Sequence, residues 1–264
     1  MFGVVAGGFG IWAAVVVPHN ALHHEGRIFG GVTAVSLPFG IIASFPRSRV
    51  TLSYTRPDME ISVQRGDLFG QKGQLVVGFS DTFDTDTTDD RIISRTSVQG
   101  QLLSGIFGGN RAELDRLLDA ALAPRSSHEI VRGEKKDGKQ RRYPIGTTAV
   151  ISNAGRRIYC VAYSELGNDL VAKSSVEFLW RSLGRLWDAV YEHGQHEPLA
   201  VPFMGSGLAR IANVDRESLI RLILLSFMAR SRERLLCKEL SVVVHPTDAT
   251  SVNMLEVRAF MGSL

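Results

Sequence analysis

The stretch LAVPFMGSGLARI, residues 199–211, decides the fold, because an apolar run ends there in a glycine-rich turn ahead of a helical pattern. The run 199–203 predicts a strand, and the GSG at 205–207 predicts a tight loop after it. A helix is expected over 214–230. A strand, a glycine loop and a helix in this order are typical of α/β folds, in which ligands lie beyond the carboxyl ends of the strands.

The same alternation of strand and helix patterns extends over residues 47–264. Six further runs predict strands over 50–54, 60–64, 75–79, 147–151, 157–163 and 240–244. Helical spacing of apolar residues predicts helices over 112–123, 176–193 and 252–261, with Asn110 as the first N-cap and Ser174 or Ser175 as the second. We therefore expect one α/β domain with parallel crossovers and a sheet covered on both faces.

The most highly charged stretch is RGEKKDGKQRR, residues 132–142. Its central Asp137-Gly138 is a turn signal, and a run of charges usually marks a solvated face. This pattern predicts an exposed hairpin or insertion.

The amino-terminal 45 residues differ from the rest in charge. They hold one acidic and one basic residue, Glu25 and Arg27, whereas the other 219 residues hold 26 acidic and 29 basic ones. Two apolar runs, 2–17 and 28–45, predict a pair of transmembrane helices within residues 1–46. At about 1.5 Å per residue they reach roughly 24 and 27 Å, slightly less than a hydrocarbon core of about 30 Å. We expect a tilted or thin arrangement, or a start that lacks upstream sequence.

Two alternatives for this region are disfavoured. A secretory signal peptide needs a basic start and a small-x-small cleavage site, and neither is present near Pro18. A pair of buried strands would be weakened by the many glycines of both runs. Arg47, Arg49 and Arg56 follow the second run, so the positive-inside rule predicts a multi-pass inner-membrane protein with residues 47–264 in the cytoplasm.

Charge and cysteine content exclude several function classes. A net charge of +3 without a basic cluster on one face predicts no nucleic-acid binding. Cys160 and Cys237 lie in no CxxC spacing and are expected to be buried thiols in a reducing compartment. His19, His23 and His24 have no ligand spacing, so no metal site is predicted.

Three sequence features could bind a ligand at the strand ends. The glycine loop at 205–207 leaves backbone N–H groups open to a phosphate, although a tight turn without ligand is equally compatible. Asp67 follows a strand and can accept hydrogen bonds from a base amino group or a ribose hydroxyl, or can act as a turn or cap residue. Asp81 and Asp84 bracket Phe83 after another strand, in an acidic loop that lacks the EF-hand pattern.

Several motifs in a fixed order resemble a known family. They are GDLF (66–69), VVGFSDTFDTDTTDDRIISRTSVQG (76–100), YPIGTTAVI (143–151), RIYCVAYSE (157–165) and VPFMGSGLARI (201–211). From residue 50 to the carboxyl terminus the chain resembles the macro domain, specifically the membrane-anchored macro-domain effectors of Thoeris anti-phage defence. The resemblance implies a three-layer α/β/α sandwich with a mixed sheet.

The resemblance also implies a site for ADP-ribose or a derivative, cyclic or conjugated to an amino acid. It implies that Asp67 meets the adenine amino group, that the glycine loop cradles the diphosphate, and that residues 81–85 edge the distal ribose. The implied ligand-binding residues are Asp67, Leu68, Asp81, Phe83, Asp84, Thr85, Gly205, Ser206, Gly207 and Leu208. No metal and no further cofactor is implied.

Two functions follow from the resemblance. The first is a non-enzymatic receptor that senses a nucleotide signal made by a TIR-domain partner, assembles as a homo-oligomer and disrupts membrane lipid. The second is a membrane-tethered ADP-ribosyl hydrolase in which Asp81 or Asp84 orients water. Because GFSD at 78–81 replaces the asparagine-rich loop of hydrolytic macro domains, the first is favoured. A membrane-anchored module with a structural role is the third possibility.

Overall fold

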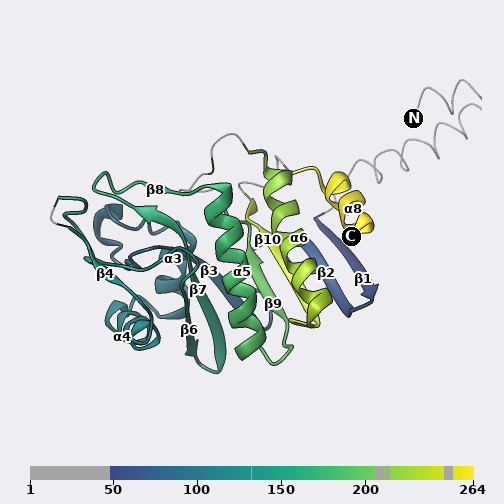
Figure 1. Cartoon of the computed structure of the whole chain (residues 1–264), viewed down its shortest axis with the longest axis horizontal. Helices are drawn as coiled ribbons and strands as arrows, with labels where there is room; N and C mark the ends of the chain where they lie inside the picture. The colour runs from purple at the N-terminus through teal and green to yellow at the C-terminus, as the bar shows by residue number, and fades with distance from the viewer. Residues whose placement is uncertain (1–47, 132, 206–210, 212–213, 247–251) are drawn as a thin grey trace, which may run out of the picture. The chain divides into compact units, whose positions relative to one another are not determined.

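The computed structural model describes residues 48–131, 133–205, 211, 214–246 and 252–264 (Figure 1). Ser48–Leu264 form one compact unit. Both transmembrane helices predicted within residues 1–46 lie outside the described residues. None of the helices in the described ranges has the length and hydropathy that a membrane span requires.

The main sheet has eight strands in the order β1-β2-β10-β9-β3-β7-β6, with β8 paired to β7. Their bounds are β1 Arg49–Thr55, β2 Asp58–Arg65, β3 Gln74–Ser80, β6 Thr148–Asn153, β7 Arg156–Leu166, β8 Ala172–Lys173, β9 Leu199–Pro202 and β10 Glu239–Val244. All seven strands predicted from the sequence are present, each end within three residues of its prediction.

The sheet is mixed, as the resemblance implies. The central strands β2, β10, β9, β3 and β7 are parallel, whereas β1 and β6 pair antiparallel with β2 and β7. Parallel crossovers, expected where helices separate strands, run from β7 to β9 and from β9 to β10, whereas two-residue turns join β1 to β2 and β6 to β7. In the second turn Ala154 and Gly155 have φ of +49° and +78°, the left-handed conformation that matches the twist of a tight hairpin.

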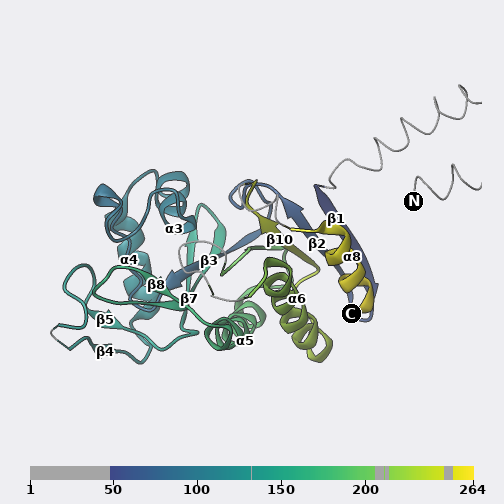
Figure 2. The same cartoon turned by 90° about the horizontal axis from the view of Figure 1, so that it is seen from above.

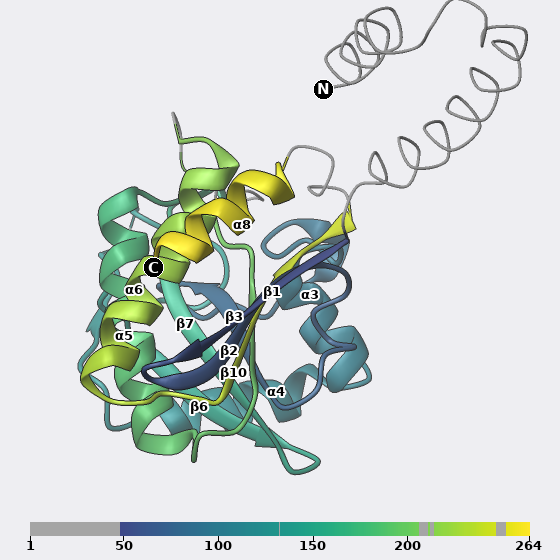
Figure 3. The same ribbon diagram turned by 90° about the vertical axis from the view of Figure 1, so that its right-hand side faces the viewer.

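Helices cover both faces of the sheet, so the unit Ser48–Leu264 has three layers. Helices α5, α6 and α8 lie on one face and α3 and α4 on the other (Figures 2 and 3). The bounds are α3 Val98–Gln101, η3 Leu102–Ile106, α4 Arg111–Leu122, α5 Val176–His193, α6 Arg216–Glu233 and α8 Met254–Ser263, with a short 3₁₀ turn η2 at Thr88–Asp90. The π-helical turn η3 directly continues α3, and the sequence patterns did not predict either.

Polar caps explain where the predicted helices begin. The Asn110 side chain accepts the Glu113 N–H at the start of α4, and Ser175, not Ser174, accepts the Phe178 N–H at the start of α5. Asp215 caps α6, so this helix begins two residues later than predicted.

Each helical layer packs against the sheet through its own apolar cluster. Trp187 of α5 and Phe227 of α6 meet edge-on at 5.3 Å between ring centroids in the first cluster. Phe79, Phe83 and Leu118 belong to the second, beneath α3 and α4. Cys160 and Cys237 are buried and free, which confirms the prediction of two buried thiols.

Candidate functional site

The sheet has a topological switch point between β9 and β3. The connection after β3 leads toward β7 and β6, whereas the connection after β9 leads the other way, to β10. These two strands pair only at their amino-terminal ends, through Gln74↔Leu199 and Leu75↔Ala200. Their carboxyl ends are not hydrogen-bonded to each other, and such a position is where open α/β sheets bind ligands.

The carboxyl ends of β2, β10 and β9 lie side by side at this edge. The Gly66 N–H donates to the Val244 carbonyl at 3.1 Å, and the Phe203 N–H donates to the Val243 carbonyl at 2.9 Å. The loops that carry Asp67 and Gly205 therefore begin at the same edge of the sheet.

Asp67 is exposed and keeps one carboxylate oxygen available. Its Oδ1 accepts the Phe69 N–H at 3.0 Å, so the carboxylate is oriented by its own loop. Within the part of the chain that the structure describes, no hydrogen bond reaches Asp67 Oδ2. Leu68 is 6% exposed and packs into the second apolar cluster. The loop therefore combines an apolar anchor with an exposed acceptor.

Gly205 starts the glycine loop in a conformation that suits glycine. Its φ is +90°, and a Cβ added there would lie 3.0 Å from Ile211 Cδ1. The Ile211 N–H donates to the Gly205 carbonyl at 3.0 Å. Ser206, Gly207 and Leu208 lie outside the described residues, and their ligand role stays a prediction.

The acidic loop, residues 81–85, is buried throughout. Its five residues are between 0% and 4% exposed. Phe83 adopts φ of +50° and places its ring between Phe79 and Tyr143, with both centroids at 5.5 Å. The Thr85 hydroxyl donates to Asp115 of α4 at 2.7 Å.

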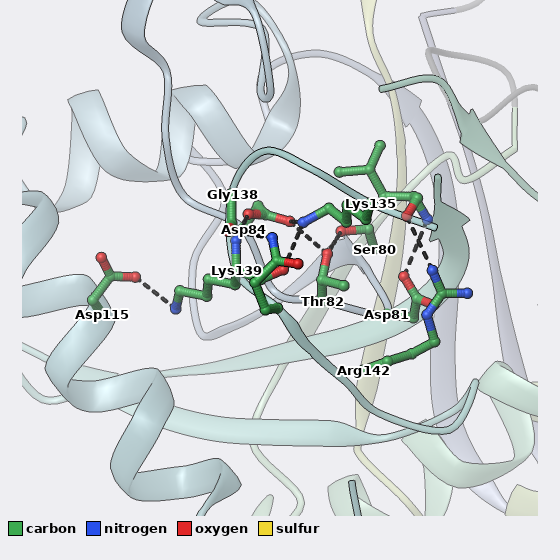
Figure 4. A network of polar contacts seen from close by, with 11 residues as sticks. Ser80, Asp81, Thr82, Asp84, Asp115, Lys135, Gly138, Lys139 and Arg142 are labelled. Atoms are coloured by element: carbon green, nitrogen blue, oxygen red, sulfur yellow. Dashed lines mark hydrogen bonds and ion pairs between the residues drawn. The ribbon is translucent and has the colours of Figure 1, made fainter. Parts of the chain in front are cut away.

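A second segment covers this loop with basic groups (Figure 4). The charged segment, residues 133–142, precedes and includes strand β5 (Arg141–Arg142), which pairs with β4 (His128–Glu129). The Lys135 ammonium donates to Asp84 Oδ2 and to the Lys139 carbonyl, both at 2.7 Å, and the Lys139 N–H donates to Asp84 Oδ1 at 2.7 Å. The Thr82 hydroxyl also donates to Asp84 Oδ2. Among the described residues, both oxygens of the Asp84 carboxylate thus accept hydrogen bonds from other parts of the chain.

The expectation of a fully solvated charge run is wrong at Lys135. This side chain is buried, because the hairpin folds back onto the acidic loop and its charge pairs with Asp84. Gly138 explains the close approach: a Cβ there would lie 2.2 Å from Asp84 Oδ1, and its φ is +80°. In the sequence, the Asp137-Gly138 turn signal indicates that the segment folds back. It does not indicate that Lys135 pairs with Asp84, because the two residues lie 51 positions apart.

Asp81 is also enclosed by the chain. Its Oδ1 accepts the Leu166 N–H at 3.1 Å, and Arg142 Nε lies 3.2 Å from Oδ2, an ion pair without hydrogen-bond geometry. Burial raises the pKa of Asp81 to about 6, although the Leu166 N–H, Arg142 and Lys135 lower it and Glu165 raises it further. The ligand role predicted for Asp81 and Asp84 stays a prediction, but both side chains are 1% exposed and already paired.

No group of three or more His, Cys, Asp or Glu side chains that could hold a metal ion occurs among the described residues. The candidate site is the sheet edge next to the switch point, where loops leave the carboxyl ends of β2, β9 and β3 and where Asp67 is exposed.

Two solved structures share this fold. A mutant of the Oceanobacillus iheyensis macrodomain superposes with a TM-score of 0.55 at 10% identity, covering 84% of this chain and 98% of that chain. A second mutant of the same macrodomain gives a TM-score of 0.54 at 10% identity, covering 81% and 100%. At this identity the likeness shows the fold, which is that of a macro domain. No curated protein matches the sequence significantly.

The family follows from the sequence itself. The profile described as "Thoeris protein ThsA, Macro domain" matches residues 61–245, well over half of the chain. The chain belongs to this family, as the sequence motifs indicated.

Proposed function

We propose that this protein is the receptor and effector of a Thoeris-type anti-phage system and binds an ADP-ribose-derived nucleotide. The observation that carries the proposal is one sheet edge of a ThsA-family macro domain, from which both the Asp67 loop and Gly205 start, and where Asp67 Oδ2 accepts no hydrogen bond from the described residues. The macro-domain fold is one whose known ligands are ADP-ribose and its relatives.

Each part of the nucleotide has a proposed partner. Asp67 Oδ2 accepts the adenine amino group, and the loop that starts at Gly205 surrounds the diphosphate with backbone N–H groups. The acidic loop edges the distal ribose through its backbone, because the carboxylates of Asp81 and Asp84 already have partners in the chain. Leu68 supports the base from the apolar side.

A receptor is preferred over an ADP-ribosyl hydrolase. A general base has to reach a water molecule that attacks the substrate. The two aspartates expected to do so are 1% exposed, and basic or amide groups of the chain pair with both. We therefore propose that no residue of this site is catalytic.

The rest of the mechanism follows by linkage. A TIR-domain partner consumes NAD and produces the nucleotide, and the nucleotide shifts the population toward an assembled homo-oligomer by its preference for that state. Residues 1–46 anchor the assembly in the inner membrane, with the macro domain in the cytoplasm, and assembly disrupts the lipid bilayer and kills the cell.

Isothermal titration of the full-length protein with ADP-ribose tests the receptor role directly. We expect saturable binding with one site per chain and no turnover of ADP-ribosylated protein under the same conditions. Release of ADP-ribose at enzymatic rates would instead establish the hydrolase.

The anchor is tested by deletion of residues 1–46. We expect the shortened protein to bind ADP-ribose and to lose toxicity when it is expressed with a TIR-domain partner. Cell killing by the shortened protein would refute the role of the anchor.

A further inference from the structure

One arginine holds the β2–β3 loop, residues 66–73, from outside that loop. Arg156, the first residue of β7, donates from Nε to the Gly73 carbonyl at 2.6 Å and from Nη1 to the Phe69 carbonyl at 3.0 Å. Its Nη2 donates to the Gln71 carbonyl. A single half-buried side chain thus binds three carbonyls of one loop.

This arrangement depends on the shape of the guanidinium group. Its five N–H donors lie in a rigid plane, so three separated carbonyls are reached by one charge without rearrangement of the side chain. Lysine has a compact ammonium on a flexible stem and cannot reproduce the planar fork. Hydrogen bonds to a charged donor are also stronger than neutral ones.

The residues that Arg156 holds are the ones that orient Asp67. Phe69, whose carbonyl binds Arg156, donates its N–H to Asp67 Oδ1. Gln71, whose carbonyl also binds Arg156, donates its side-chain amide to the Asp67 carbonyl at 2.8 Å. On the far side, Gln64 of β2 donates to the Gln71 side-chain oxygen and to Ser241 of β10 at 3.0 Å. Phe69 and Gln71, which Arg156 holds, therefore fix the position of Asp67.

We propose that Arg156 is a positioning residue for recognition of the nucleotide base. It holds the β2–β3 loop so that Asp67 Oδ2 points toward an amino group of the ligand, although Arg156 itself does not touch the ligand. This inference rests on the proposed nucleotide-binding function and extends it to a residue about ninety positions away in the sequence.

The test compares two ligands and two neighbouring arginines in the full-length protein. ADP-ribose carries the adenine amino group, whereas inosine diphosphate ribose carries a carbonyl oxygen at that position and cannot donate to Asp67. We expect Arg156→Gln and Arg156→Lys to weaken ADP-ribose binding about tenfold or more, the loss of roughly one charged hydrogen bond. Binding of inosine diphosphate ribose should change less than about threefold.

Arg157→Gln is the matched control. Arg157 is adjacent and also donates to a backbone carbonyl, that of His193, and among the described residues no hydrogen bond or ion pair joins it to residues 66–73. We expect its affinities for both ligands to equal those of the wild type. Gln71→Ala is a second variant that removes one hydrogen bond to the Asp67 carbonyl. It should reproduce the selective loss of ADP-ribose affinity and replaces Arg156→Gln if that variant fails to fold.

The outcomes separate the two ideas. If the wild type does not bind ADP-ribose, the proposed function fails. If the wild type binds ADP-ribose, the variants decide the positioning role. That role is refuted if the Arg156 variants, or Gln71→Ala in their place, lose affinity for both ligands equally or for neither, and the receptor role then stands.

Discussion

Two aspartate-bearing loops leave the same edge of the sheet, and they have opposite surroundings. In the acidic loop after β3, Asp84 is 1% exposed and binds Lys135, the Lys139 N–H and Thr82. In the loop after β2, Asp67 is exposed and has one oxygen without a partner among the described residues. An aspartate at a strand end therefore either holds the fold together or remains available to a ligand.

The difference arises from what each loop is packed against. The charged segment folds over the acidic loop and brings basic side chains from 51 and 61 positions further along the chain, Lys135 to Asp84 and Arg142 to Asp81. A buried carboxylate is tolerated only when it is paired and hydrogen-bonded, so the loop and its cover depend on each other. Among the described residues, the carboxylate in the loop after β2 accepts one hydrogen bond, from the Phe69 N–H of its own loop, and no segment covers it as the charged segment covers Asp84.

The largest effect is expected from Lys135→Met. The substitution removes the cation and leaves the Asp84 carboxylate buried without its charge partner, which costs about 3 to 5 kcal/mol of the free energy of unfolding. Urea denaturation of the full-length protein measures it. Lys136→Met, at the exposed neighbouring position, is the control and should change stability by less than about 0.5 kcal/mol.

A double variant shows whether the loss of stability comes from the buried Asp84 carboxylate that has lost its charge partner. Combining Lys135→Met with Asp84→Asn removes both charges and keeps an acceptor for the Lys139 N–H. We expect it to recover at least half of the lost stability. A double variant that is less stable than Lys135→Met alone would contradict the ion-pair explanation.

The next effect is a pH dependence carried by Asp81. Its folded-state pKa of about 6 lies above the ordinary value of 3.8, so the folded protein binds the proton more tightly than the unfolded chain does. Stability from this group is therefore highest at low pH and falls as pH rises from about 4 to 6, by about 2 to 3 kcal/mol. Asp81→Asn should remove this fall.

The measurement is the difference in unfolding free energy between wild type and Asp81→Asn at pH 4, 5, 6 and 7. Taking the difference cancels the contributions of other carboxylates to the pH dependence of stability. Hydrogen bonds lower the pKa of Asp86 and Asp215, for example, so their contributions rise with pH. A difference that does not change with pH would show that the Asp81 carboxyl is not enclosed by the chain.

Much of the fold could be predicted because it depends on local patterns. Apolar runs such as 75–79 and 240–244 and the helical spacing in 176–193 report burial directly, and caps such as Asn110 mark helix starts. Strand order and direction could not be obtained in this way. The antiparallel pairing of β6 with β7 depends on a two-residue turn, Ala154-Gly155, that helix and strand periodicity does not reveal.

The candidate site was predictable only in part. Position after a strand pointed to Asp67, Asp81 and Asp84 alike, because sequence shows the end of a strand but not what covers it. The charge run predicts a solvated Lys135 for the same reason, because its partner Asp84 lies 51 positions earlier in the chain. Arg156 was not singled out, since it binds backbone carbonyls, and any residue type can supply those.

The smallest effect on stability is expected from Asp67→Asn, which changes the exposed aspartate of the two loops. The asparagine oxygen can still accept the Phe69 N–H, so the unfolding free energy should change by less than about 0.5 kcal/mol. The free Oδ2 becomes an amide nitrogen, which repels an amino group, and ADP-ribose affinity should fall about ten- to hundredfold, the value of a hydrogen bond to a charged group. Calorimetric titration and urea denaturation of the same preparation measure both quantities, with Asp119→Asn as the exposed control. Loss of stability with unchanged affinity would place Asp67 with Asp84 among the aspartates that hold the fold, and the contrast between the two loops would no longer hold.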